Sequence, residues 1–379
     1  MRLNHGSKLD FDDVLLVPQR TKTASRKSVD VERFFKFYHS QRVWNGTPVM
    51  AANMDTTGTF AMSSVLSKFS MVTCLHKHYP AREIGNFLSD YNEENGETLN
   101  SVERCWFSMG IKESDIIKLR EVVDYSSVCP NICIDVANGY TDDFVNFCNS
   151  IRQEFPTPVI MAGNVCTPEM VQELVLHGGV DIVKIGIGPG SACTTRLKTG
   201  VGYPQLSAIE ECSHAAHGLK SDEQRMGLIC ADGGCRTSGD VCKAFAANSD
   251  FVMLGGMLAG TDECEGRWEE QNELIKNEHG GTTLTGKKVK TALQFYGMSS
   301  HTAQQKHGGD IKTYRASEGR VKRVPYKGPV ELVIQDLLGG LRSSCSYIGA
   351  TCLKDMAKCA EFVQVNRTHF DQSTNDLGV

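Results

Sequence analysis

The sequence lacks any apolar run that approaches the roughly 20 residues needed to cross a bilayer. Its first residues, MRLNHGSKLDFDD, also lack the apolar core of a secretory signal peptide. We therefore expect a cytoplasmic protein with no membrane partner.

An excess of positive charge is missing as well. The formal net charge is −5 at pH 7, which argues against a surface that binds polyanions in general. We expect no nucleic-acid partner, although this charge is compatible with a local basic pocket for a small anion.

Paired cysteine motifs are absent, although the chain has 15 cysteines. No CxxC occurs, and the cysteines are scattered through a long chain rather than concentrated in a small secreted domain. This pattern argues against structural zinc and against a disulfide framework. Most of these cysteines are expected to be reduced core residues.

Eight short apolar runs, rich in Val, Ile, Met and Cys, are present along the 379 residues. Runs without polar alternation are typical of strands buried on both faces of a parallel sheet. They cover residues 48–55, 71–77, 105–111, 131–139, 158–165, 181–190, 227–234 and 250–256.

The segments between these runs have helix signals. Thr167 can cap a helix, Pro168 suits its first position, and Gly178 or Gly179 can end it. Another helix is expected to start at Ser238 and to stop near residue 248. Eight strand-helix units predict a (β/α)8 barrel rather than a doubly wound sheet.

A single catalytic barrel domain is expected over residues 1–379. Residues 1–47 precede the first predicted strand. The polar segment from about 261 to 325 is interpreted as a solvated excursion followed by a loop or flap. Helices and a tail are expected from about 326 to 379.

Glycine pairs follow the seventh and eighth predicted strands. In a barrel the carboxyl ends of the strands carry the site, and backbone amides at these two positions commonly bind phosphate. Gly233-Gly234 and Gly255-Gly256 are therefore candidates for a phosphate site, with tight turns as the structural alternative. Asp232 can accept hydrogen bonds from ribose hydroxyls.

Cys193 follows the sixth predicted strand, in the stretch GPGSACTTRLKTG. The preceding GIGPGS does not satisfy the dinucleotide pattern GxGxxG, because Ser191 occupies the place of the third glycine. Arg196 and Lys198 can favour a reactive thiolate. Spacing alone leaves a structural thiol open as the alternative.

Several long motifs, in this order along the chain, resemble the IMP dehydrogenase/GMP reductase family. They are KLDFDDVLLVP, GIGPGSACTTRLKTGVGYPQ, ADGGC, FVMLGGMLAG, FYGMSS and YRASEG. The resemblance covers about residues 8–365.

The reductase branch of the family is favoured over the dehydrogenase branch. The segment CLHKHYPAREIGNFL leaves no room for the regulatory modules that dehydrogenases usually carry, and KTGVGYPQ and FYGMSS are similar to reductases. The sequence departs from the family's common pattern in a longer segment at 261–290 and in extra residues near 219–226.

The resemblance implies a conversion of GMP and NADPH to IMP, ammonia and NADP+. Cys193 would be the nucleophile that attacks C2 of the purine, forming a covalent thioimidate. Thr195 and Glu318 would relay the proton that departing ammonia requires.

The resemblance also implies the binding residues. The substrate GMP or IMP would contact Asp232, Gly233, Gly234, Gly255, Gly256, Gly297, Met298, Ser299, Arg315, Ala316, Ser317 and Gly319. NADPH would contact Ser25, Arg26, Lys77, Asp135, Val136, Ala137, Ser343, Ser344, Cys345 and Ser346. A monovalent cation, expected to be potassium, would bind main-chain carbonyls at Gly188, Gly190, Cys193 and Arg196. A homotetramer is implied in the same way.

Three other functions remain open from the sequence. The nearest is oxidation of IMP with NAD by a dehydrogenase-type enzyme. The second is a flavin-dependent oxidoreductase that uses the same phosphate loops, and the third is a nucleotide-binding scaffold without catalysis.

Overall fold

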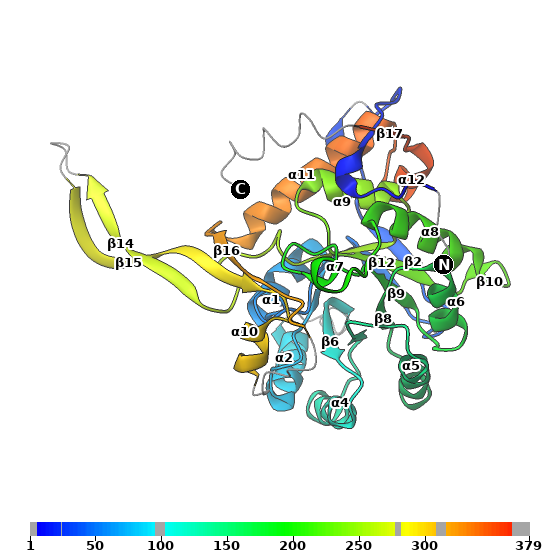
Figure 1. Ribbon diagram of the computed structural model, residues 1–379, viewed down its shortest axis with the longest axis horizontal. Helices are drawn as coiled ribbons and strands as arrows, with labels where there is room; N and C mark the ends of the chain where they lie inside the picture. The colour runs from blue at the N-terminus through cyan, green and yellow to red at the C-terminus, as the bar shows by residue number, and fades with distance from the viewer. Residues whose placement is uncertain (1–5, 24, 95–102, 277–281, 308–315, 366–379) are drawn as a thin grey trace.

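The computed structural model describes residues 6–23, 25–94, 103–276, 282–307 and 316–365 (Figure 1). Of the site residues expected from the sequence, Arg315 lies outside the described residues.

Eight parallel strands form a closed barrel in the order β12-β13-β4-β5-β6-β7-β8-β9. Each of the eight apolar runs predicted from the sequence supplies one strand. The strands are β4 (Val49–Ala51), β5 (Val72–Cys74), β6 (Cys105–Met109), β7 (Ile132–Asp135), β8 (Ile160–Val165), β9 (Ile182–Ile185), β12 (Leu228–Asp232) and β13 (Phe251–Leu254).

A helix on the outside of the barrel follows each strand, which confirms the predicted (β/α)8 fold (Figure 1). These helices are α1 (Phe60–Leu66), α2 (Ala81–Glu94), α4 (Glu113–Ser126), α5 (Asp142–Glu154), α6 (Pro168–Leu176), α8 (Gln205–Gly218), α9 (Ser238–Ala246) and α11 (Val330–Ile348). Because α2 starts only a few residues after β5, no domain is inserted there.

Helix starts follow the expected chemistry, with one correction. Thr167 is the N-cap of α6 and Pro168 is its first residue, as predicted. α9 begins at Ser238, as predicted, but the residue that caps it is Thr237 rather than Ser238. The Thr237 hydroxyl accepts a hydrogen bond from the Asp240 amide, and the Asp240 carboxylate accepts one from the Thr237 amide. This reciprocal capping box selects Thr237 over its neighbour.

The amino-terminal end of the barrel is plugged by a hairpin of β2 (Arg33–Lys36) and β3 (Val43–Gly46). Phe35 and Trp44 of the hairpin contact Phe251, with ring centroids 4.9 and 5.2 Å from the Phe251 ring. Together with Met50, Ile182 and other inward-facing residues they form a core inside the barrel. Because described residues fill this end of the barrel, a ligand is expected to enter from the carboxyl ends of the strands.

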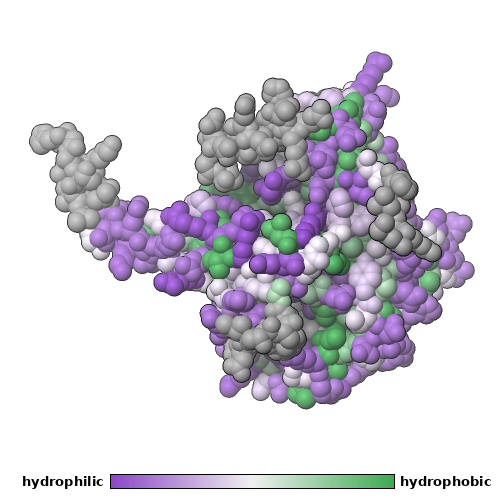
Figure 2. All heavy atoms as spheres, in the orientation of Figure 1, coloured by the Kyte–Doolittle hydropathy of each residue, from purple (hydrophilic) through white to green (hydrophobic). Residues whose placement is uncertain are grey.

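The polar segment after β13, expected to be a solvated excursion followed by a loop, contains a three-stranded antiparallel sheet that the sequence did not predict. β14 (Trp268–Lys276) and β15 (Thr282–Tyr296) form a long hairpin, and β16 (Val321–Pro325) pairs with β15. The hairpin projects from the barrel, and Figures 1 and 2 show it as an arm with mostly hydrophilic residues. Strands with both faces in water lack the apolar alternation that identifies a strand in sequence.

Two further short pairs of antiparallel strands lie outside the barrel. The extra residues near 219–226 form the two-stranded β10 (Lys220–Ser221) and β11 (Gln224–Arg225). β1 (Val14–Leu16) pairs with β17 (Phe362–Gln364) and so joins the two ends of the described chain.

All 15 cysteines are free, as expected. Within the described residues, no helix is both long and apolar enough to cross a membrane.

The capping box of α9 gives a stability prediction. Thr237→Ala removes the cap hydrogen bond and should lower the free energy of unfolding by about 1 kcal/mol. Ser238→Ala, one residue further along, should change it by less than about 0.5 kcal/mol. Urea unfolding followed by circular dichroism measures both, and equal losses in the two variants would contradict the assignment.

Candidate active site

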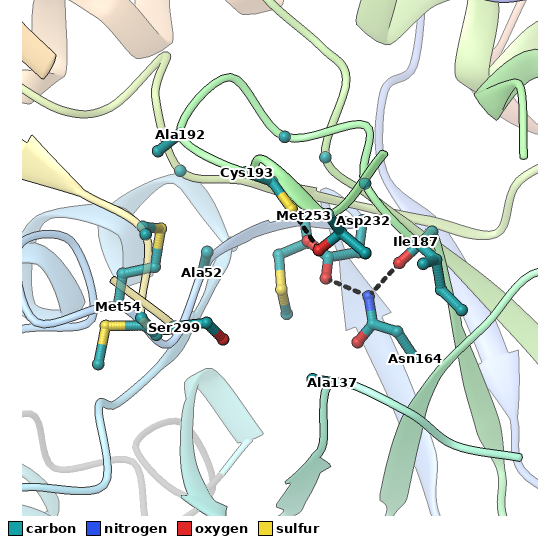
Figure 3. Close-up of a pocket in the computed structure, with 18 of the residues that line it drawn as sticks. Ala52, Met54, Ala137, Asn164, Ile187, Ala192, Cys193, Asp232, Met253 and Ser299 are labelled. Carbon is teal, nitrogen blue, oxygen red and sulfur yellow. Dashed lines mark hydrogen bonds between the residues drawn. The ribbon is translucent and has the colours of Figure 1, made fainter. Parts of the chain in front are cut away.

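A cavity of about 250 Å³ opens at the carboxyl ends of the barrel strands (Figure 3). Its walls come from the loops after β4, β7, β8, β9, β12 and β13 and from the segments near residues 295–299 and 318. Most of the expected catalytic and substrate residues line it. They are Cys193, Thr195, Glu318, Asp232, Gly233, Gly234, Gly255, Gly256, Gly297, Met298 and Ser299.

Three side chains form a hydrogen-bonded chain at the cavity wall. The Cys193 Sγ lies 3.2 Å from the Thr195 Oγ1, and that hydroxyl donates to the Glu318 Oε2 at 2.6 Å. Because the threonine proton points to the carboxylate, the threonine oxygen is free to accept the thiol proton. The arrangement can carry a proton between sulfur and carboxylate.

Glu318 reaches Cys193 through backbone pairing between distant segments. The Thr194 amide donates to the Glu318 carbonyl at 2.8 Å, and the Arg320 amide donates to the Ala192 carbonyl at 2.9 Å. Residues 318–320 therefore run as an extended segment beside the cysteine loop. This pairing brings together residues that lie more than a hundred positions apart.

The main chain at the glycine pairs borders a space that any side chain in place of these glycines would fill. We call this space the glycine cradle. Gly233 and Gly234 have φ angles of +84° and +88°, in the left-handed region that favours glycine. A Cβ on Gly233 would lie 3.2 Å from the Gly190 nitrogen, and a Cβ on Gly256 would lie 3.2 Å from the Ser191 Oγ. The loops after β9, β12 and β13 thus meet with their main chains exposed to the cavity, as a phosphate site requires.

Charged groups of opposite sign meet at the base of the cavity. The Lys184 Nζ lies 2.7 Å from Asp135 and 2.9 Å from Asp232. Burial acts to lower the pKa of Lys184, yet the two carboxylates outweigh it and raise that pKa well above its ordinary value. Burial likewise acts to raise the pKa of Asp135, but the charge of Lys184 leaves it below its usual value.

Sequence reasoning missed several of the cavity residues, among them Asn164 and Lys184. Asn164 donates to Asp232 at 2.8 Å and to the Gly186 carbonyl at 2.7 Å, and Figure 3 shows its amide directed toward Asp232. Lys184 is almost fully buried. Its signal in the sequence was a second charged residue, three positions after Asp181, in the otherwise apolar run 181–190.

Three of the remaining substrate candidates do not line the cavity. Ala316, Ser317 and Gly319 flank Glu318 without reaching the cavity surface. Gly319 packs against Ser300, since a Cβ there would lie 2.8 Å from the Ser300 nitrogen.

The expected cofactor residues fall in two places. Asp135, Val136 and Ala137 line the cavity, whereas Lys77 is exposed beyond the end of β5 and does not. Ser25, Arg26 and the stretch Ser343, Ser344, Cys345 and Ser346 also lie outside the cavity lining. The Arg26 guanidinium lies 5.5 Å from the ring centroid of Tyr347, so these two segments adjoin each other. The Cys345 side chain is fully buried.

The expected cation carbonyls belong to one loop. Gly188 and Gly190 line the cavity, the Gly190 carbonyl accepts from the Cys193 amide, and the Arg196 carbonyl accepts from Gly200. Each carbonyl oxygen keeps a second lone pair, so this donor set is compatible with a monovalent cation. The Arg196 side chain points elsewhere and binds Asp10 at 3.0 Å.

Asp55, His78 and His307 place possible metal ligands within 4.8 Å of one another. The two imidazoles are parallel, however, with centroids 3.3 Å apart, so their lone pairs do not converge on one tetrahedral point. The Lys306 ammonium also lies 3.4 Å from Asp55. This cluster fits an ion-pair contact between α10 (His301–Lys306) and the barrel better than a metal centre.

The histidines of this region predict a loss of stability in acid. Burial lowers the pKa of both His76 and His78 to about 4. As the pH falls from 6.5 towards 4, the unfolded chain binds protons that the folded chain does not, and so folding is disfavoured. His78→Gln should therefore reduce by a few degrees the fall in melting temperature between pH 7 and pH 5. His177→Gln, at an exposed histidine after α6, is the matched control and should leave the wild-type fall unchanged. An unchanged fall in His78→Gln would contradict the assignment.

Comparison with known proteins gives a consistent result. The family model described as IMP dehydrogenase / GMP reductase domain matches residues 8–375. A protein of Tolumonas auensis named GMP reductase is 48% identical over 366 residues, covering 97% of both chains. GMP reductase 1 of Homo sapiens is 48% identical over 368 residues, covering 97% of this chain and 98% of its own. GMP reductase of Escherichia coli O81 is 47% identical over 365 residues, covering 96% and 97%.

Proposed function

Because the chain belongs to the IMP dehydrogenase/GMP reductase family, we propose that it is a GMP reductase, which converts GMP to IMP and ammonia with NADPH. The observation that carries the proposal is the Cys193, Thr195 and Glu318 chain at the wall of a cavity that has a glycine cradle. This combination provides a nucleophile, a proton path and a phosphate site around one nucleotide.

GMP binding follows from the positions of the cavity residues. The 5′-phosphate would bind main-chain groups of Gly233, Gly234, Gly255 and Gly256. Asp232 would accept hydrogen bonds from the ribose hydroxyls. Ser299, which Figure 3 shows on the other side of the cavity from Asn164, would then contact the base together with its neighbour Met298, which also lines the cavity.

The covalent step uses the sulfur and its two partners. The Cys193 Sγ attacks C2 of the purine, and the thiol proton passes through Thr195 and Glu318 to the 2-amino group. The C2–N bond breaks, ammonia leaves, and a thioimidate remains. Addition of a hydride to C2 and return of a proton to sulfur then break the C–S bond and release IMP. Dividing the substitution into two steps lowers the barrier of each.

NADPH, when bound, supplies the hydride. Asp135, Val136 and Ala137 would hold its nicotinamide end, because these residues share the cavity with Cys193. Lys77, Arg26 and Ser25 carry groups suited to phosphate, and the stretch 343–346 adds hydroxyls beside Arg26. Gly188, Gly190, Cys193 and Arg196 would hold potassium through their carbonyls. A homotetramer and a cytoplasmic location stay predictions.

The proposed reaction is tested with GMP and NADPH as substrates. We expect absorbance at 340 nm to fall while ammonia and IMP appear in equal amounts. Cys193→Ala should lower turnover by at least about 1000-fold, because the nucleophile is gone, while GMP still binds in calorimetry. Reduction of NAD by IMP without turnover of GMP would instead establish the dehydrogenase reaction, and a yellow purified protein would indicate a flavin enzyme.

The proton path predicts a difference between adjacent threonines. Thr195→Val breaks the hydrogen bonds to Cys193 and Glu318 and should lower kcat by about 100-fold or more, with little change in the affinity for GMP. Thr194→Val is the matched control, because the Thr194 hydroxyl bonds only weakly to the Ser317 carbonyl, at 3.4 Å, and does not line the cavity. Equal kcat losses in the two variants would remove Thr195 from the relay.

A further inference from the structure

Lys184 holds a position in the barrel that is unusual for a charged residue. It belongs to β9 and is 2% exposed, and its Nζ lies 3.9 Å from the Met253 sulfur. Buried ammonium groups are costly unless they are paired. Its two partners, Asp135 and Asp232, are the residues that face the expected cofactor and the expected substrate.

The barrel register explains how one side chain reaches both carboxylates. Asp232 ends the neighbouring strand β12, while Asp135 ends β7, which lies two strands away on the other side. Between them, Gly163 of β8 pairs with Lys184. A Cβ on Gly163 would lie 2.7 Å from the Lys184 Cβ, so the glycine leaves room for the lysine.

Amides complete the network on both sides. Asn53 donates to Asp135 at 3.0 Å, and Asn164 donates to Asp232 at 2.8 Å. Each carboxylate is therefore fixed by the shared ammonium and by its own amide. Both carboxylates still line the cavity, so each can meet a ligand from above.

We propose that Lys184 is a positioning residue whose ammonium holds the carboxylates of Asp135 and Asp232 at a fixed separation, so that the nicotinamide end of the cofactor and the ribose of the nucleotide are bound in register. This inference rests on the proposed function. Removing the ammonium leaves two partly exposed carboxylates without the cation that they share, and their mutual repulsion then favours a larger separation of the two side chains. Other ionisable groups near this site are Cys74, Cys133 and Cys230 inside the barrel and Lys77 beyond β5.

The test first removes the positive charge of Lys184 and then restores the net charge of the site with a second substitution. Lys184→Met keeps an unbranched side chain and should lower kcat/KM for both GMP and NADPH by roughly 100-fold. The loss should also depend on pH. The pKa of Asp135 should rise without Lys184, so kcat/KM for NADPH should fall further as the pH is lowered from 8 to 6, whereas the wild type stays level.

The double variant Lys184→Met with Asp135→Asn has the wild-type net charge at this site, with Asp232 as its single carboxylate. Its affinity for GMP, measured by calorimetry, should return to within a few-fold of wild type, while KM for NADPH stays raised and the acid loss disappears. Arg152→Lys is the matched control, because it weakens a buried ion pair with Asp181 away from the cavity. It should lower the melting temperature without changing either KM or the pH profile.

Equal losses of GMP affinity in the single and double variants would overturn the inference, and so would failure of both to fold. If only Lys184→Met fails to fold, the rescue by Asp135→Asn supports it, because the two proteins differ by that carboxylate. Wild-type turnover of GMP with NADPH is measured first. Its absence would overturn the proposed function, whereas normal wild-type turnover with an unperturbed Lys184→Met would overturn this inference alone.

Discussion

Closure of the parallel sheet is the constraint on which the rest of the structure depends. Pairing of β13 with β4, with Val252 opposite Val49, joins the last strand of the barrel to the first. The Ala52 amide then donates to the Leu254 carbonyl at 2.9 Å, so the loops after these two strands start side by side. Because all eight strands run in one direction, their carboxyl ends share one rim. The cysteine loop, the two glycine pairs and the acidic strand ends converge there although they follow different strands.

The barrel interior has charged side chains and apolar side chains at different levels. Its middle is filled by apolar side chains and thiols, while carboxylates stand at both ends, buried at the amino-terminal end and partly exposed at the other. At the amino-terminal end Asp181 accepts hydrogen bonds from the amides of His39 and Ser40 and pairs with Arg152, so it is fully used in holding the hairpin plug. At the other end Asp135 and Asp232 share one ammonium and remain open to the cavity. A carboxylate therefore has a structural role at the amino-terminal end, where protein groups occupy its hydrogen-bonding positions. At the carboxyl end the carboxylates keep positions that a ligand can use.

Much of the barrel could be predicted from the sequence, because a strand buried on both faces must be continuously apolar. The hairpin of β14 and β15 could not, because its faces are largely in water and carry no such signal. At the site, Cys193 and Thr195 are sequence neighbours, but their link to Glu318 depends on the pairing of residues 318–320 with the cysteine loop. Spacing cannot reveal that pairing, and only the family motif pointed to Glu318. Lys184 was visible as an odd charge in an apolar run, yet its partners follow from the register across Gly163.

The position of Cys193 depends on residues outside its own motif. The Asp10 carboxylate, just before β1, accepts hydrogen bonds from the Arg196 side chain and from the Gln205 amide, at the two ends of the segment that follows the cysteine. The Gln205 side chain in turn donates to the Ile185 carbonyl, at the end of β9, where the loop begins. Since β1 pairs with β17, the segment that carries Asp10 is itself fixed by the end of the described chain. A loop rich in glycine can therefore present a thiol at a defined distance from Thr195, because its rigidity comes from contacts with distant segments rather than from its own sequence.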